Sequence, residues 1–232
     1  MEFHIEKKNY VQMSDRVSEV MTDFDIKPEH SNETFVGSLD IEDKEWNVGL
    51  IVGGSGTGKS TIAKQLFNRF YVTGYQYDDR SVLDNMPERC STKEIELAFT
   101  SVGFSSPPSW LKPYHVLSTG EKMRVDLARS ILSRNRTVVF DEFTSVVDRE
   151  VAKTCSMAVQ KEVRRRNKRF VAVSCHKDIV EYLQPDWVYD TDQKRFFGQG
   201  GLVSSPNTNL TYTKLVDAIS NQYGQFLGSI II

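Results

Sequence analysis

An apolar run that ends in a glycine-rich loop constrains this chain more than any other feature. The segment EWNVGLIVGG is rich in β-forming residues and leads directly into SGTGKST. The residues GGSGTGKS fit the pattern G-x-x-x-x-G-K-[ST], in which backbone N–H groups surround phosphate oxygens. Ile62, Leu66, Phe67 and Phe70 then recur at helical spacing. This order of strand, loop and helix predicts a P-loop nucleotide site in an α/β fold.

The residue types of the loop predict how it binds a nucleotide. We expect Lys59 to reach the β- and γ-phosphates and the Ser60 hydroxyl to bind Mg²⁺, while the start of the following helix attracts the negative charge. ATP and Mg²⁺ are therefore the predicted cofactors. The residues expected at the nucleotide are Gly53, Gly54, Ser55, Gly56, Thr57, Gly58, Lys59, Ser60 and Thr61.

The segment TVVFDE supplies a second part of such a site. Its apolar residues predict a buried strand, and two acids, Asp141 and Glu142, follow directly. A carboxylate that leaves the end of a strand beside a P-loop can hold the Mg²⁺ shell, which gives Asp141 that role. Glu142 can then polarise the attacking water as a general base.

The remaining pattern predicts a layered α/β protein with a mainly parallel sheet. STKEIELAFTSVGF has a Ser start and a Glu three residues later, which predict a capped helix, whereas the prolines of SSPPSWLKP predict a loop. We expect RVSEVMTDFDI to form an early strand. Further strands are expected in TFVGSLDI, RFVAVSCH and PDWVYD. A helix with Met123, Leu127 and Ile131 on one face is expected, and another helix at about 149–167.

Composition limits the class of protein. The chain has 232 residues with a net charge of −2, which gives no overall attraction to nucleic acid or anionic membrane. No apolar run is long enough to span a bilayer, and the three cysteines have no paired spacing. We therefore expect a reduced, cytoplasmic protein without a transmembrane segment of its own. A domain over residues 1–200 and a tail of unknown role over 201–232 are predicted.

The stretch HVLSTGEKMR resembles the LSGGQ signature of ABC-type ATPases. Ser118, Gly120 and Glu121 occupy signature positions, although Thr119 replaces a glycine and Glu121 a glutamine. In that family the signature helix of one subunit caps the γ-phosphate held by the P-loop of another. The resemblance therefore implies a homodimer in which a second copy completes each site. The alternative is that this stretch is a simple helix N-cap.

The order of the other motifs also resembles that family, over about residues 35–195. Asp148 in SVVD occupies the position of the family's D-loop, which communicates across the dimer. His176 occupies the position of its switch histidine, which contacts the γ-phosphate. The implied fold is a P-loop NTPase of the ABC ATPase type, with flanking helices around the core sheet. An N-terminal antiparallel β part and a short helical subdomain at about 80–133 are also implied.

Two family features have no clear counterpart. For the glutamine that binds Mg²⁺ and water, Gln76 is one candidate, and Asp84 or Asn85 in SVLDNMP is the preferred alternative. For the aromatic residue that stacks on adenine, we expect Phe24, with His30 as second choice. The compact spacing between Lys59 and Ser118 is similar to the ATPase half of ABC ATPase–acetyltransferase fusion proteins.

The sequence leaves the task of the ATPase open. The main hypothesis is a soluble ABC-type ATPase whose head-to-tail dimerisation drives an unknown mechanical task on a protein or nucleic-acid client. One alternative is the ATP-binding subunit of a transporter that docks on a separate membrane protein. Another is a weakly hydrolysing ATP sensor or a nucleic-acid-associated ATPase. The basic cluster KEVRRRNKR, residues 161–169, is interpreted as a helix end facing solvent, with a partner contact as the alternative.

Overall fold

A six-stranded sheet forms the centre of the molecule. The computed structural model describes residues 1–8, 11–27 and 32–198. The strand order is β4-β5-β6-β3-β7-β8, and each neighbouring pair is parallel except β7 with β8. These strands are β3 (Val48–Val52), β4 (Tyr71–Val72), β5 (Thr137–Phe140), β6 (Arg169–Ser174), β7 (Trp187–Asp190) and β8 (Arg195–Gly198). The predicted α/β core with a mainly parallel sheet is confirmed.

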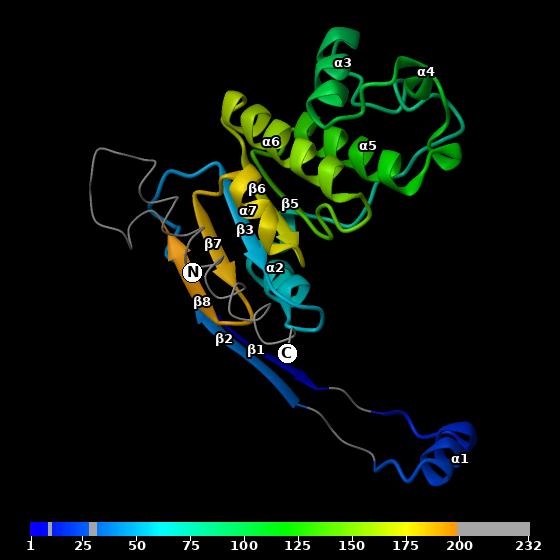
Figure 1. Cartoon of the computed structure of the whole chain (residues 1–232), viewed down its shortest axis with the longest axis vertical. Coiled ribbons are helices and arrows are strands. Elements are labelled where there is room, and N and C mark those ends of the chain that lie inside the picture. Colours follow the sequence, from blue (N-terminus) through cyan, green and yellow to red (C-terminus); the bar gives the residue numbers. More distant parts are fainter. Residues whose placement is uncertain (9–10, 28–31, 199–232) are drawn as a thin grey trace, which may run out of the picture.

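A separate antiparallel pair and the helices other than α1 lie around this sheet (Figure 1). The pair consists of β1 (Glu2–Lys8) and β2 (Asn32–Ser38). The helices are α1 (Asp15–Asp23), α2 (Lys59–Phe67), α3 (Thr92–Ser101), α4 (Pro107–Trp110), α5 (Thr119–Leu132), α6 (Arg149–Arg165) and α7 (Val180–Leu183). Short 3-10 turns cover Asn68–Phe70, Tyr114–Val116 and Lys177–Ile179.

The two faces of the sheet bury two apolar clusters, because successive side chains of a strand point to opposite faces. On β3, Leu50 and Val52 join the cluster that includes residues of α3, α5 and α6, whereas Ile51 joins the cluster that includes residues of α2 and β1. On β6, Phe170 and Val171 divide in the same way. The sheet is therefore covered on both faces, as a parallel sheet requires.

The segment expected as an early strand is instead helical. Figure 1 shows α1, which carries Val17, Val20 and Met21, beyond the β1–β2 pair and away from the sheet. These apolar residues are three and four positions apart, and the Ser14 hydroxyl caps the helix by accepting from the Val17 amide. The strand prediction for residues 16–26 was wrong because this spacing is helical.

Three other elements, α4, β1 and β8, also differ from the sequence prediction. The predicted loop SSPPSWLKP contains α4, whose two prolines lie in the first turn, where a missing N–H costs nothing. The strands β1 and β8 were not predicted, since their sequences EFHIEKK and RFFG lack the long apolar runs of β3 and β6.

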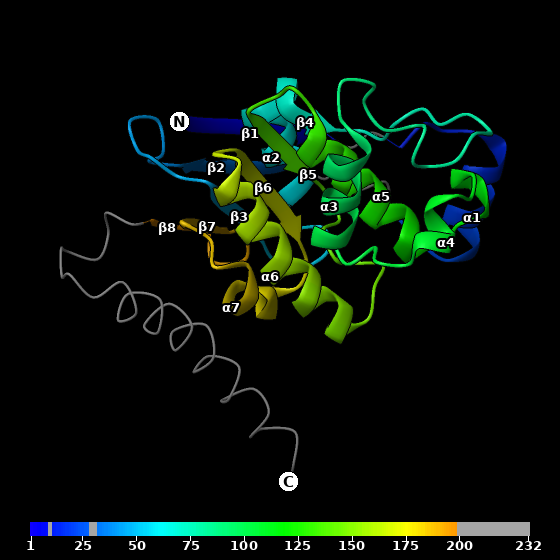
Figure 2. The same ribbon diagram turned by 90° about the horizontal axis from the view of Figure 1, so that it is seen from above.

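The expected domain division is only partly within the described residues. Residues 80–133 contain α3, α4 and α5, which lie together on one side of the sheet (Figure 2). The tail predicted over 201–232 lies outside the residues that the structure describes, so its role stays a prediction.

Candidate functional site

The glycine-rich loop between β3 and α2 presents its backbone at one edge of the sheet. Gly58 caps α2 with a positive φ of 87°, and a Cβ atom there would lie 2.3 Å from the ring of Phe35. Only glycine fits this backbone angle and this close approach. The Lys59 ammonium donates to the Gly54 carbonyl at 2.5 Å, and the Thr57 hydroxyl donates to the same oxygen at 2.9 Å.

The loop is also held by the turn after β7. The Asp192 carboxylate accepts a hydrogen bond from the Gly54 amide at 2.9 Å, and the hydroxyls of Thr57 and Thr191 are 2.6 Å apart. Hydrogen bonding by the Gly54 amide, together with Lys177, lowers the pKa of Asp192 even though burial opposes this shift. Asp192 and Thr191 have no signal in the sequence that links them to the loop more than 130 positions earlier.

The two acids after β5 lie at the same edge of the sheet. The register that pairs β5 with β6 and β6 with β3 places the residues after each strand side by side at their carboxyl ends. Asp141 Oδ1 accepts from the Glu142 amide at 2.9 Å, and Asp141 Oδ2 accepts from the Tyr71 hydroxyl. Glu142 is exposed, so its carboxylate is accessible to water.

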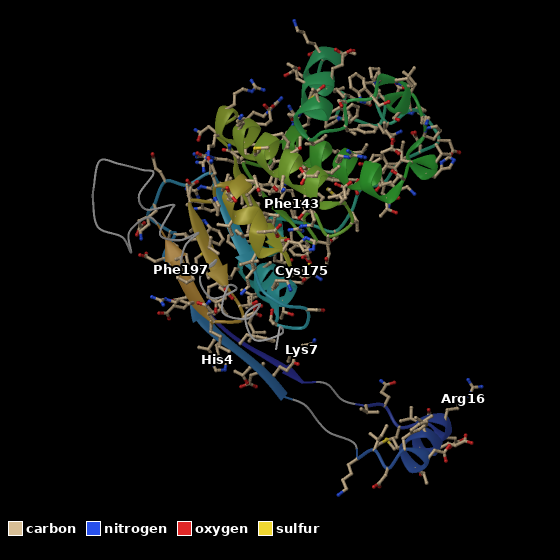
Figure 3. All side chains as sticks on the ribbon, in the orientation of Figure 1. His4, Lys7, Arg16, Phe143, Cys175 and Phe197 are labelled. Carbon is tan, nitrogen blue, oxygen red and sulfur yellow. The ribbon has the colours of Figure 1, made fainter. Side chains whose placement is uncertain are left out.

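The backbone after β5 turns sharply. Glu142 has a φ of 54° and Thr144 a φ of 67°. Residues other than glycine rarely adopt such positive φ angles. Such strain persists where surrounding contacts fix the backbone. Here the Phe143 amide donates to the Val173 carbonyl at 2.9 Å, and the Phe143 side chain is fully buried beside β6 (Figure 3). The turn thus fixes the direction of Glu142.

His176 follows β6 at the same edge. The residues that follow β6 lie beside those that follow β3, because Val52 pairs with Ser174 in parallel register. Nδ1 of His176 is 3.5 Å from the hydroxyl of the buried Thr144. Burial lowers the pKa of His176, and the charge of Arg149 lowers it further against an opposing effect of Glu142. The ring is therefore neutral at neutral pH and keeps one N–H to donate.

The start of α5 is a capping box. The Ser118 hydroxyl accepts from the Glu121 amide at 3.3 Å, and Glu121 Oε2 accepts from the Ser118 amide at 3.0 Å. These bonds lower the pKa of Glu121. Ser118 is nevertheless exposed. Asp148 caps α6 in the same manner, by accepting from the Val151 amide at 2.9 Å.

The start of α5 lies apart from the glycine-rich loop. Glu121 Oε1 accepts from the Ser109 hydroxyl of α4 at 3.0 Å, and Figures 1 and 2 show α5 beginning beside α4 and running back toward the sheet. A Cβ atom on Gly120 would lie 3.2 Å from Val147, so this start packs against the turn that leads to Asp148. The structure therefore gathers residues 53–61, Asp141, Glu142 and His176, and places the signature residues elsewhere.

The candidates for the missing glutamine have other contacts. Asn85 is buried and its amide donates to the Asp78 carboxylate and to the Ser81 carbonyl, which staples the 78–85 turn. Asp84 accepts from the Ser81 hydroxyl, and Gln76 is exposed. The side chain that does contact Asp141 is Tyr71, which was not predicted.

The expected adenine-stacking residue is misplaced. Phe24 lies at the end of α1 with 72% of its surface exposed, away from the loop, and the alternative, His30, lies outside the described residues. α1 is separated from the sheet by the β1–β2 pair, which explains the error. A pocket of about 460 Å³ adjoins the loop instead, and Phe35, Thr57 and Asp192 are among its lining residues.

The basic cluster at 161–169 is largely paired within the chain. Arg165 and Arg166 contact Glu162, and Arg164 contacts Asp186 at 3.0 Å. The Lys168 ammonium donates to the Ser133 and Asn135 carbonyls. These contacts agree with the interpretation as a helix end rather than as a free basic patch.

Comparison with curated proteins finds ABC transporter components. No protein-family model matches the chain. It is 26% identical over 201 residues to the mitochondrial iron–sulfur clusters transporter ABCB7 of Homo sapiens, which covers 68% of this chain and 26% of that protein. It is also 26% identical over 201 residues to the methionine import ATP-binding protein MetN of Rhodospirillum rubrum. That match covers 70% of this chain and 57% of MetN. The chain thus spans less than two thirds of the length of these relatives.

Solved structures share the fold. The post-hydrolysis dimer of the ATP-binding cassette MJ0796, bound to ADP and Pi, matches with a TM-score of 0.57 and 14% identity over 86% of this chain and 100% of that chain. A bacterial Atm1-family ABC exporter with ATP bound matches with a TM-score of 0.53 and 17% identity. This match covers 75% of the present chain and 37% of the exporter chain. The chain therefore has the fold of an ABC ATPase cassette, as the motif order predicted.

Proposed function

We propose that the chain binds and hydrolyses Mg-ATP and closes head-to-tail with a second copy of itself around two nucleotides. The observation that carries this proposal is that the start of α5 lies apart from the glycine-rich loop within one chain (Figures 1 and 2). The loop of residues 53–60 gathers with Asp141, Glu142 and His176, whereas the start of α5 packs against α4 and Val147. We infer that Ser118 serves the P-loop of a second copy rather than that of its own chain.

The residues at the sheet edge divide the work of phosphoryl transfer. Lys59 and the loop amides hold the phosphates, Glu142 orients and deprotonates the attacking water, and the neutral His176 donates to the γ-phosphate. Ser118 and Gly120 of the second copy complete the phosphate site, and Asp148 contacts across the dimer. Glu121 keeps the α5 start in shape through its hydrogen bonds to Ser118.

The donor set fits Mg²⁺. Ser60 and Asp141 offer hydroxyl and carboxylate oxygen, which this ion prefers, and it commonly keeps water and phosphate oxygens as its other ligands. Among the described residues, no group of three or more His, Cys, Asp or Glu side chains could hold a metal alone. A Mg²⁺ ion at Ser60 and Asp141 would neutralise negative charge on the phosphates of ATP. We propose that the adenine base of ATP binds in the pocket beside Phe35, and not against Phe24.

The test is steady-state phosphate release by the purified chain. We expect turnover with Mg-ATP, and a loss of about 10²-fold or more in Glu142→Gln because general base catalysis contributes at least that much. Lys59→Ala is the control for phosphate binding. A wild-type rate no faster than that of Lys59→Ala would replace hydrolysis with the sensor alternative.

A transporter subunit is the second candidate, because both curated relatives reported above are transport proteins by name. No helix among the described residues is long and apolar enough to cross a membrane. This candidate predicts co-purification with an integral membrane protein. The likeness to the ATPase half of acetyltransferase fusions, the cytoplasmic location and the client all stay predictions.

A further inference from the structure

Tyr71 lies on β4, the strand at one end of the strand order, close to Asp141. It is one of the two residues of β4 and pairs in parallel register with Val139 of β5, two residues before Asp141. Its ring packs under the ammonium of Lys64 on α2, 5.1 Å from the ring centre, and against the cluster beneath that helix. The hydroxyl group is thereby directed to the space between α2 and the end of β5.

The Tyr71 hydroxyl contacts one of the two expected metal ligands. It donates to Asp141 Oδ2. The other oxygen of Asp141 accepts from the Glu142 amide at 2.9 Å. Both carboxylate oxygens are therefore engaged.

The phenol is a neutral donor to a charged acceptor in this position. A hydrogen bond from a neutral donor to a carboxylate is stronger than one between neutral groups.

We propose that Tyr71 is a latch on the metal site: its hydroxyl holds Asp141 and must leave Asp141 Oδ2 when a metal ion binds there. An ion that took Asp141 Oδ2 as a ligand would compete with the Tyr71 phenol for that oxygen. This inference rests on the proposed role of Ser60 and Asp141 as metal ligands.

Tyr71→Phe tests the latch, because it keeps the ring over α2 and removes only the hydroxyl. Metal affinity is measured by titrating Mn²⁺, in place of Mg²⁺, into protein saturated with a non-hydrolysable ATP analogue, with free Mn²⁺ followed by electron paramagnetic resonance. We expect Mn²⁺ to bind about tenfold tighter to the variant, since a hydrogen bond to a charged group no longer has to be broken.

Tyr75→Phe is the matched control. It also removes one phenol hydroxyl, which lies 2.9 Å from the hydroxyl of Ser130 and away from the acids. We expect the Mn²⁺ affinity of this variant to equal that of the wild type. Thermal unfolding of each variant without ligand confirms that both are folded.

A second readout follows the phenol itself. Adding Mn²⁺ to the nucleotide-bound wild type should produce a tyrosine difference spectrum in the near ultraviolet, as the Tyr71 hydroxyl changes its partner. This signal should be absent in Tyr71→Phe and present in Tyr75→Phe. A purely structural tyrosine would not lose its hydrogen bond when the metal binds, and would give no such signal.

The outcomes separate the latch from the proposed function. If the wild type binds the analogue and Mn²⁺ but Tyr71→Phe binds Mn²⁺ with equal or lower affinity, the latch is wrong and the function stands. If the wild type binds neither nucleotide nor Mn²⁺, the proposed function itself fails, and the latch fails with it.

Discussion

Asp126 on α5 is a carboxylate held by two tyrosines. Its oxygens accept from the Tyr77 hydroxyl at 2.7 Å and from the Tyr114 hydroxyl at 2.8 Å, and the two rings stack with centroids 3.9 Å apart. Burial raises the pKa of Asp126, although both hydrogen bonds and the charge of Arg129 oppose this shift. The desolvation of the charge thus outweighs its partners.

The raised pKa of Asp126 predicts the effect of removing its charge. A pKa that is raised in the folded protein adds stability that is fully present when the pH is below the pKa of the unfolded state, about 3.9. This stability is lost as the pH rises through the pKa of the folded state. At neutral pH the wild type has lost that contribution, whereas Asp126→Asn remains neutral and still contacts both phenols. We expect its melting temperature to equal or exceed that of the wild type at neutral pH, with the difference vanishing near pH 4.

Asp126→Leu is the control for packing, because it removes the acceptors of both tyrosines and should cost about 1–3 kcal/mol. A melting temperature of Asp126→Asn several degrees below that of the wild type at neutral pH would contradict the account. It would mean that the charge itself stabilises the tyrosine pair.

For single residues, the distance along the sequence between the partners of a site decides which of them can be predicted. Residues 53–60 form a local pattern, and Asp141 and Glu142 follow an apolar strand, so their gathering at one sheet edge follows from parallel topology. Tyr71 meets Asp141 across 70 positions. It belongs to a strand of only two residues, which gives no periodic signal. Asp192 is still more remote from Gly54, by 138 positions.

Two helices carry the same N-terminal chemistry. Ser91 and Glu94 form a capping box on α3, and Ser118 and Glu121 form one on α5. In each case hydrogen bonds from the capping serine lower the pKa of the glutamate. The local geometry alone therefore does not distinguish a structural cap from a start that also binds phosphate.

The pair of caps provides a matched test. Ser91→Ala and Ser118→Ala should each lower the free energy of unfolding by about 1 kcal/mol, because each loses one cap. Only Ser118→Ala should lower phosphate release, by about tenfold or more, because only that hydroxyl also meets a transferring phosphate. Equal phosphate release from both variants would show that LSTGE is a helix cap and nothing further.

Elements were predictable where one periodicity was strong. The strands β3, β5 and β6 and the helices α2, α3, α5 and α6 follow from apolar runs, helical spacing and caps. The strand expected over α1 is wrong, because Val17, Val20 and Met21 are spaced as in a helix. α4 was hidden by its prolines, which are tolerated in a first turn.

At the scale of the whole molecule, the part of the chain that the structure describes contains one glycine-rich loop with the P-loop pattern, and the start of α5 is exposed. The loop lies where β3 meets α2, and the α5 start lies beside α4 on the helical side of the sheet (Figure 2). Two copies related head-to-tail could bring each start to the loop of the other. The fold is that of cassettes such as MJ0796, whose solved structures are dimeric.

Light scattering on Glu142→Gln tests this arrangement most directly. With the general base removed, bound Mg-ATP should persist and hold two copies together, so the measured mass should be twice the 26.5 kDa of the chain. Without nucleotide, and in Glu142→Gln combined with Lys59→Ala, the mass should be that of one copy. A Glu142→Gln chain that stays monomeric while saturated with Mg-ATP would contradict the composite site.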